Sequence, residues 1–132
     1  MGLLFFPQMA SNICQRLFKK VWKSYATDLP KAPESEGIYA IGFLQQYPPG
    51  VEVLYVGRSI HIRTRLRQHK NGKQEISELV KEQFDLNDGE NLCIKWVEVA
   101  KSQCLEKEYL GCMEEILGYW PRCNLKHGDT CN

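Results

Sequence analysis

Residues 37–57 read GIYAIGFLQQYPPGVEVLYVG, and this stretch decides the fold. Residues 37–45 and 51–56 are rich in the β-branched and aromatic residues that strands prefer. Between them, Tyr47-Pro48-Pro49-Gly50 has the composition of a tight turn. Two strand-like runs joined by a turn predict a β-hairpin.

Helical and strand patterns continue after the hairpin. Gly57 ends the second run, and Ser59 is placed to cap a helix that runs to about residue 71. Apolar spacing predicts a further helix around residues 76–84, a third strand over 92–99, and a last helix from Ser102 to near Gly118. This order predicts an α+β fold: a small three-stranded, largely antiparallel sheet flanked by helices.

An extra amphipathic helix is predicted before the hairpin. It starts at Ser11 or Asn12, carries Leu17 and Val21 on its apolar stripe, and ends before Asp28. Its basic residues largely fall away from that stripe. We therefore divide the chain into an N-terminal segment, residues 1–35, consisting of this helix and a proline-containing linker, and a folded domain, residues 36–132.

Length and composition bound the class of protein. The 132 residues are 43% hydrophobic and 25% charged, as in an ordinary globular domain. No apolar run approaches the roughly 18 residues of a membrane span, and the opening residues make a poor signal peptide. The six cysteines form no Cys-x-x-Cys pair, and buried free thiols are the plain expectation, with Cys131 left open. We therefore predict a cytoplasmic or nuclear protein that is not secreted and makes no membrane contact.

The net charge of +1 hides an uneven distribution. Residues 58–73 contain six basic residues and no acid, whereas residues 75–115 contain eleven acids and four lysines. A basic block on a folded surface is typical of phosphate binding. On charge alone, a solvated helix face is the favoured explanation.

Short motifs at fixed spacing point to one family. Gly37-Ile38-Tyr39 and Tyr55-Val56-Gly57 resemble the two halves of the GIY-YIG nuclease signature. Arg65 follows Tyr55 by ten residues and His69 follows Arg65 by four, one turn along the same helix face. The stretch from Pro121 to Asn124 is similar to the family's closing Pro-x-x-Asn. The resemblance spans residues 36–126.

This resemblance implies a divalent-metal-dependent endonuclease that hydrolyses DNA phosphodiester bonds with little intrinsic sequence specificity. Tyr39 and Tyr55 would activate water, and one of the two phenols could accept the water proton if a nearby metal ion and guanidinium lower its pKa from about 10. Arg65 and His69 would bind and neutralise the phosphate, and Asn124 would hold the floor of the site. Taken singly, the tyrosines could be core residues, the arginine a surface residue and the histidine a packing residue.

The family's metal ligand is a glutamate on the last helix, which selects Glu108 as the ligand for Mg²⁺ or Mn²⁺. In several family members the register counted back from the closing asparagine would place Cys112 there, and a thiol suits these ions poorly. Either the helix has an extra turn, which we favour, or the metal site is degraded. Glu106, Glu114 and Glu115 are alternative ligands.

DNA is the expected partner, as a duplex, a branched structure or a single strand. The residues predicted to contact its phosphates are Arg58, Arg63, Arg67, Lys70 and Lys73. One alternative function is a GIY-YIG-fold module that binds nucleic acid with weak or no catalysis. Another is a scaffold whose N-terminal helix recruits a protein partner. The sequence gives no oligomeric state.

Overall fold

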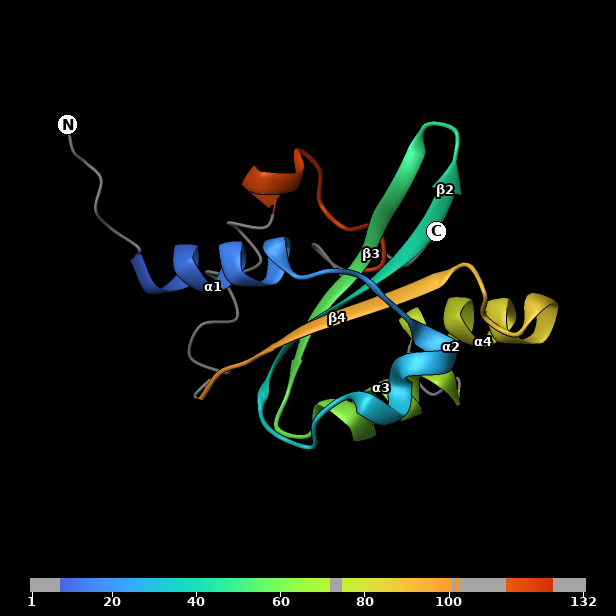
Figure 1. Cartoon of the computed structure of the whole chain (residues 1–132), viewed down its shortest axis with the longest axis horizontal. Helices are drawn as coiled ribbons and strands as arrows, with labels where there is room; N and C mark the ends of the chain where they lie inside the picture. The colour runs from blue at the N-terminus through green and yellow to red at the C-terminus, as the bar shows by residue number, and fades with distance from the viewer. Residues whose placement is uncertain (1–7, 72–74, 101, 103–113, 125–132) are drawn as a thin grey trace.

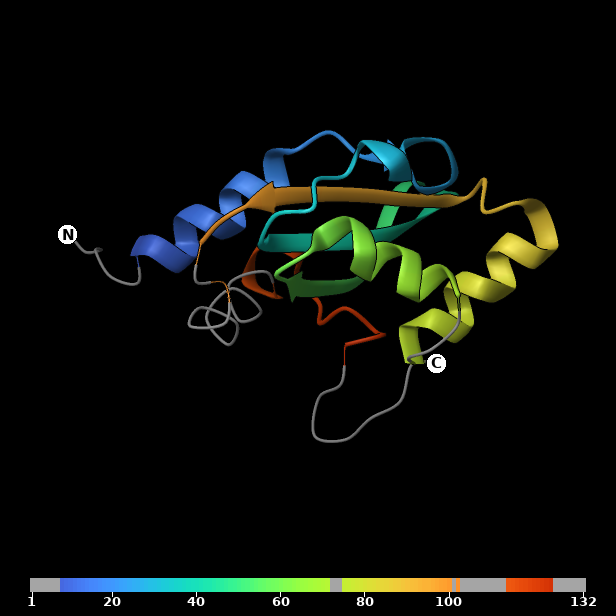
Figure 2. The same cartoon turned by 90° about the horizontal axis from the view of Figure 1, so that it is seen from below.

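The computed structural model describes residues 8–71, 75–100, 102 and 114–124. Figures 1 and 2 show the path of the chain in two perpendicular views. The elements in order are α1 (Gln8–Lys19), β1 (Lys23–Ser24), α2 (Tyr25–Asp28), the 3₁₀ turn η1 (Leu29–Lys31), β2 (Gly37–Gln46), β3 (Pro49–Ser59), α3 (Ile62–Lys70), α4 (Glu75–Asn87) and β4 (Leu92–Glu98).

The sheet is antiparallel and has the order β1-β4-β2-β3. The α+β class is confirmed, and so are the hairpin and the strand near residues 92–99. The predicted count of three strands is wrong, because the two-residue β1 adds a fourth strand along β4. Two residues are too few for a periodicity to be read from the sequence.

Alternate residues of β2 face opposite sides of the sheet, as strand geometry requires. Tyr39 and Ile41 belong to a core formed with α2, α3 and α4. Ile38 and Ala40 belong to a second core, which Leu17 of α1 closes on the other face. The helices therefore cover both faces of the sheet (Figure 2).

The predicted N-terminal helix ends early. Instead of continuing toward Asp28, α1 stops at Lys19. Lys95 of β4 explains the stop: its ammonium donates to the carbonyls of Phe18 (3.0 Å) and Lys20 (3.4 Å). These are the carbonyls that the end of a helix leaves without partners.

Among the described helices, none is long and apolar enough to cross a membrane.

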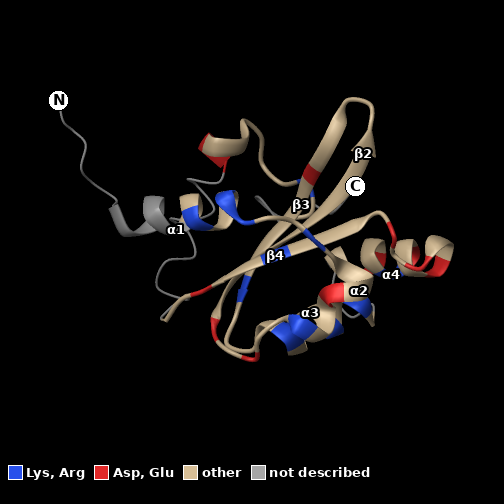
Figure 3. Cartoon of the chain, in the orientation of Figure 1, with Lys and Arg blue, Asp and Glu red and all other residues tan. Residues whose placement is uncertain are grey.

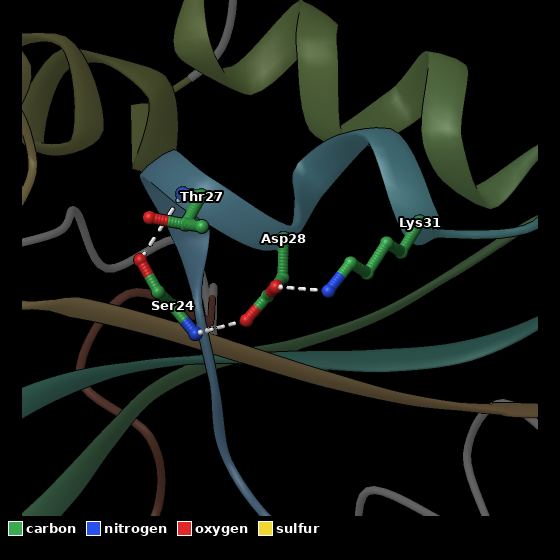
Figure 4. A network of polar contacts seen from close by, with 4 residues as sticks. All are labelled: Ser24, Thr27, Asp28 and Lys31. Carbon is green, nitrogen blue, oxygen red and sulfur yellow. Dashed lines mark hydrogen bonds and ion pairs between the residues drawn. The ribbon is translucent and has the colours of Figure 1, made fainter.

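A short capped helix follows the break (Figure 4). The Thr27 amide donates to the Ser24 hydroxyl oxygen (3.1 Å), and the Ser24 amide donates to the Asp28 carboxylate (3.1 Å). Lys31 pairs with the same carboxylate at 3.2 Å. Ser24 therefore starts a new helix where the sequence pattern had predicted a continuous one.

The cysteines differ from the expectation of free thiols. Cys14 and Cys123 are both disulfide-bonded, so the expectation is wrong for these two. Cys93 is free, as predicted, and is half-buried in β4. Cys104, Cys112 and Cys131 lie outside the described residues. An even number of cysteines without a recognisable spacing did not reveal the bonds.

Candidate functional site

The two motif tyrosines lie on one face of the hairpin. Tyr39 pairs with Gly57, and Ile41 pairs with Tyr55. A β-bulge after this second pair shifts the register, so that Leu54 and Tyr55 both pack against the core under α3. The Tyr39 and Tyr55 ring centroids are 6.0 Å apart. Tyr39 is fully buried, whereas Tyr55 is partly exposed.

Steric crowding explains why glycine occupies Gly37 and Gly57, one in each motif. A Cβ atom on Gly57 would lie 2.6 Å from the Tyr55 ring and 2.7 Å from the Tyr39 hydroxyl. A Cβ atom on Gly37 would lie 2.2 Å from the Val97 carbonyl of the neighbouring strand. The tyrosine rings therefore lie directly over the backbone at Gly57. A larger residue at this position would occupy the space that the rings fill.

Helix α3 brings His69 against both tyrosines. The centroid of the His69 ring is 5.8 Å from that of Tyr39 and 5.5 Å from that of Tyr55. The Tyr39 hydroxyl and His69 Nε2 are hydrogen-bonded at 2.7 Å. The three side chains form one cluster, which we call the aromatic cluster. The spacing of motifs along the sequence predicted these three residues as one site.

A fourth residue belongs to this arrangement, and no pattern in the sequence pointed to it. Ser77 of α4 is fully buried, and its hydroxyl is hydrogen-bonded to His69 Nδ1 at 3.0 Å. No motif includes Ser77, and serine is ordinary in the first turn of a helix. Only the packing of α4 against α3 brings it to the histidine.

Burial sets the protonation of the aromatic cluster. Desolvation raises the pKa of Tyr39 well above its ordinary value of 10, with the nearby Tyr55 adding to the rise and Arg65 opposing it. Desolvation also lowers the pKa of His69 from 6.5 to about 4, and the Arg65 charge adds to this. Both side chains are therefore neutral at pH 7. Burial therefore opposes, at Tyr39, the lowered phenol pKa that the sequence prediction required of a tyrosine that activates water.

Arg65 supplies positive charge beside the cluster. It lies one helical turn before His69, is half-buried, and influences the pKa of both Tyr39 and His69. In the described part of the chain, its guanidinium makes no hydrogen bond or ion pair with another residue. A half-buried arginine without a carboxylate partner is well suited to bind an anion.

Asn124 holds the strand that carries Tyr55. Its side-chain oxygen accepts from the Val56 amide (2.8 Å), and its side-chain nitrogen donates to the Val56 carbonyl (2.7 Å). The Cys123 amide donates to the Leu54 carbonyl (2.8 Å), and the Val53 amide donates to the Tyr119 hydroxyl (2.8 Å). This C-terminal segment covers the outer edge of β3 and contacts it on both sides of Tyr55.

The predicted phosphate-binding residues do not all lie together, although several basic residues are on α3 (Figure 3). Arg58 pairs with Ile38, so it lies on the sheet face opposite Tyr39. Arg63 donates to the Ala32 carbonyl at 2.7 Å. Lys73 lies outside the described residues. The described members of this set therefore do not all lie on the face of the sheet that carries the aromatic cluster.

Arg67 and Lys70 line a different feature, a pocket of about 330 Å³ between α3 and the segment that contains α2 and η1. The other lining residues are Ala26, Leu29, Pro30 and Asn71. The Lys70 ammonium also lies 4.7 Å from the centroid of the Phe84 ring. These two basic residues therefore face away from the tyrosines.

A cluster of metal-ligating side chains is not found in the described part of the chain. None of the described His, Cys, Asp and Glu side chains form a group of three or more that could hold an ion. Glu108 and Glu106 lie outside the described residues, and Glu114 and Glu115 belong to a short helical stretch at residues 114–117. The arrangement around the aromatic cluster offers phenols, an imidazole and a guanidinium, which together suit an anionic ligand.

No protein-family model, curated protein or solved structure matches this chain. The resemblance to the GIY-YIG family therefore depends on the motif residues and on their arrangement alone.

Proposed function

We propose that this chain is a GIY-YIG-type endonuclease, which hydrolyses DNA phosphodiester bonds with the help of a divalent metal ion and with little sequence specificity. The observation that carries the proposal is the environment of the Arg65 guanidinium. The guanidinium is half-buried, lacks a partner among the described residues, and lies beside the two motif tyrosines and His69.

The arrangement suggests a division of roles. Arg65 binds two oxygens of one phosphate through its planar fork of donors. Tyr55 is the partly exposed phenol and contacts the substrate, while buried Tyr39 and His69 support it from behind. In the reaction, a water oxygen bonds to phosphorus, the bond to the leaving oxygen breaks, and that oxygen takes up a proton. Arg65 stabilises the negative charge that grows on the phosphate oxygens.

A metal ion would add charge neutralisation at the phosphate. In the proposed enzyme Glu108 would hold Mg²⁺ or Mn²⁺, and the described residues contain no group of three or more His, Cys, Asp and Glu side chains that could hold such an ion.

A plasmid-nicking assay with Mg²⁺ tests the proposal. We expect Arg65→Ala to lower the cleavage rate by roughly 100-fold or more, the usual cost of removing one donor to a developing oxyanion. Arg65→Lys keeps the charge but lacks the planar fork, so it should also cleave slowly. Arg16→Ala removes an exposed arginine of α1 and serves as the matched control. Cleavage by Arg65→Ala at the rate of the control would refute the assignment.

The neutral, buried state of Tyr39 also favours the second candidate, a module that binds DNA without cutting it. In that case the unmodified protein would bind DNA and leave plasmid intact at all Mg²⁺ and Mn²⁺ concentrations. Arg65→Ala would then weaken binding, and Glu108→Ala would not.

The compartment is a separate proposal. The cytoplasmic or nuclear prediction depended on the lack of a membrane span and of a recognisable signal peptide in the sequence, and the disulfides of Cys14 and Cys123 are a separate observation that speaks against it. Disulfides persist mainly in oxidising compartments. We therefore propose that the protein matures in one of these.

A further inference from the structure

The interior hydrogen bonds around His69 determine where its proton lies. The Ser77 hydroxyl is fully buried and contacts His69 Nδ1, and this is its one hydrogen bond in the described part of the chain. His69 Nε2 contacts the Tyr39 hydroxyl, which also has a side-chain hydrogen bond with Tyr55. A neutral imidazole has one N–H group and one acceptor nitrogen, so only two arrangements are possible.

In the first arrangement the proton is on Nδ1, which donates to the Ser77 oxygen. The hydroxyl proton of Ser77 then has no acceptor, although the side chain has no exposed surface. A buried donor without a partner is strongly unfavourable.

In the second arrangement Ser77 donates to Nδ1, Nε2–H donates to the Tyr39 oxygen, and Tyr39 donates to Tyr55. Every proton of Ser77, His69 and Tyr39 then has an acceptor. The direction of the whole chain follows from the fact that the serine has a single partner.

We infer that Ser77 is a positioning residue, which holds His69 in the Nε2–H tautomer and so makes His69 a donor to Tyr39. This inference rests on the proposed function, because it assigns a role within the same site. It also restricts that function: with its acceptor nitrogen occupied by Ser77, His69 does not take a proton from Tyr39 or from water.

The groups that face the imidazole come from four elements. They are Tyr39 of β2, Tyr55 of β3, Arg65 of α3 and Ser77 of α4. Among the described residues, none of the groups that contact or electrostatically influence His69 is a carboxylate. The ring therefore has no anionic partner that would favour its charged form.

NMR of the full chain labelled with ¹⁵N-histidine tests the tautomer directly. We expect the His69 proton on Nε2 at pH 7, and the same in Ser77→Thr, which retains the hydroxyl. In Ser77→Ala, the midpoint of the His69 titration should rise by roughly half to one pH unit. The lost hydrogen bond favoured the neutral ring, and one such bond corresponds to a shift of that size. A proton on Nδ1 in the unmodified protein would overturn the inference, and so would an unchanged midpoint in Ser77→Ala.

Plasmid nicking supplies the functional readout. We expect Ser77→Ala to cleave about tenfold more slowly, and Ser77→Thr to restore most of the rate, since one lost hydrogen bond is worth roughly that factor. Ser24→Ala is the matched control, because it likewise removes one serine hydroxyl, in this case the one that accepts from the Thr27 amide, away from the aromatic cluster. Equal rates for Ser77→Ala and the control would contradict a positioning role.

The two readouts separate the two proposals. If the unmodified protein nicks no DNA, the proposed nuclease function fails, and the NMR experiment still decides whether Ser77 fixes the tautomer.

Discussion

Lowering the pH from 8 to 5 is expected to destabilise this protein, and His69 should account for about 2 kcal/mol of the loss. The imidazole is fully buried, and its pKa is about 4 in the folded protein, against an ordinary value of 6.5. As the pH falls below 6.5, the unfolded chain binds a proton that the folded chain does not bind until about pH 4. Protonation therefore stabilises the unfolded state relative to the folded state over this range, and the free energy of unfolding decreases as the pH falls.

The magnitude follows from the two pKa values. At pH 5 nearly all unfolded chains carry the proton and about one folded chain in ten does, which gives the figure of about 2 kcal/mol. For a domain of this size, such a loss lowers the melting temperature by roughly 6–10 °C.

Urea unfolding at pH 8 and pH 5 would measure the effect in the unmodified protein and in two variants. His69→Gln removes the buried imidazole, so its stability should depend less on pH by the predicted amount. His61→Gln is the matched control, because His61 is exposed at the start of α3. The reasoning would be refuted if both variants lost as much stability on acidification as the unmodified protein.

Three further outcomes follow from packing and charge. Gly57→Ala would force a methyl group against the two tyrosine rings, and should lower the free energy of unfolding by about 1–3 kcal/mol in urea titrations; an unchanged midpoint would mean that the rings move aside freely. Lys95 has a pKa lowered by burial from 10.5 to about 8, so the folded protein releases its proton first, and stability should rise by about 2 kcal/mol between pH 7 and 9.5. Lys95→Met should abolish that rise, and a variant with the same rise would assign it to another group. Reducing the disulfides of Cys14 and Cys123 should cost roughly 2–5 kcal/mol, visible as a lower melting temperature with a reductant present; identical melting curves would show that the bonds do not brace the fold.

The sequence was sufficient where local patterns decide the structure. The hairpin follows from two runs of strand-forming residues joined by a turn. The placement of Arg65 and His69 on one face of a helix follows from their spacing of four residues. The steric need for Gly57 fits the motif but becomes evident only when both rings are seen over it.

Long-range contacts explain what could not be predicted. The early end of α1 depends on Lys95, which lies more than seventy residues away along the chain. The contact of Ser77 with His69 depends on how two helices pack, and no pattern within either helix encodes it. The sequence prediction of a lowered phenol pKa considered a nearby metal ion and guanidinium; the burial that raises the pKa of Tyr39 depends on how the helices pack over the sheet.

The covered edge of β3 has a practical consequence. An outermost strand with open amide and carbonyl groups is a template on which other chains can add strands and aggregate. Here the Asn124 carboxamide imitates a neighbouring peptide group at Val56, and Arg122 pairs with Glu52 of the same strand at 3.2 Å. Ending the chain before Tyr119 would therefore expose the unpaired amide and carbonyl groups along the edge of β3, the strand that bears Tyr55. Affinity tags and truncations are safer when they leave residues 119–124 intact.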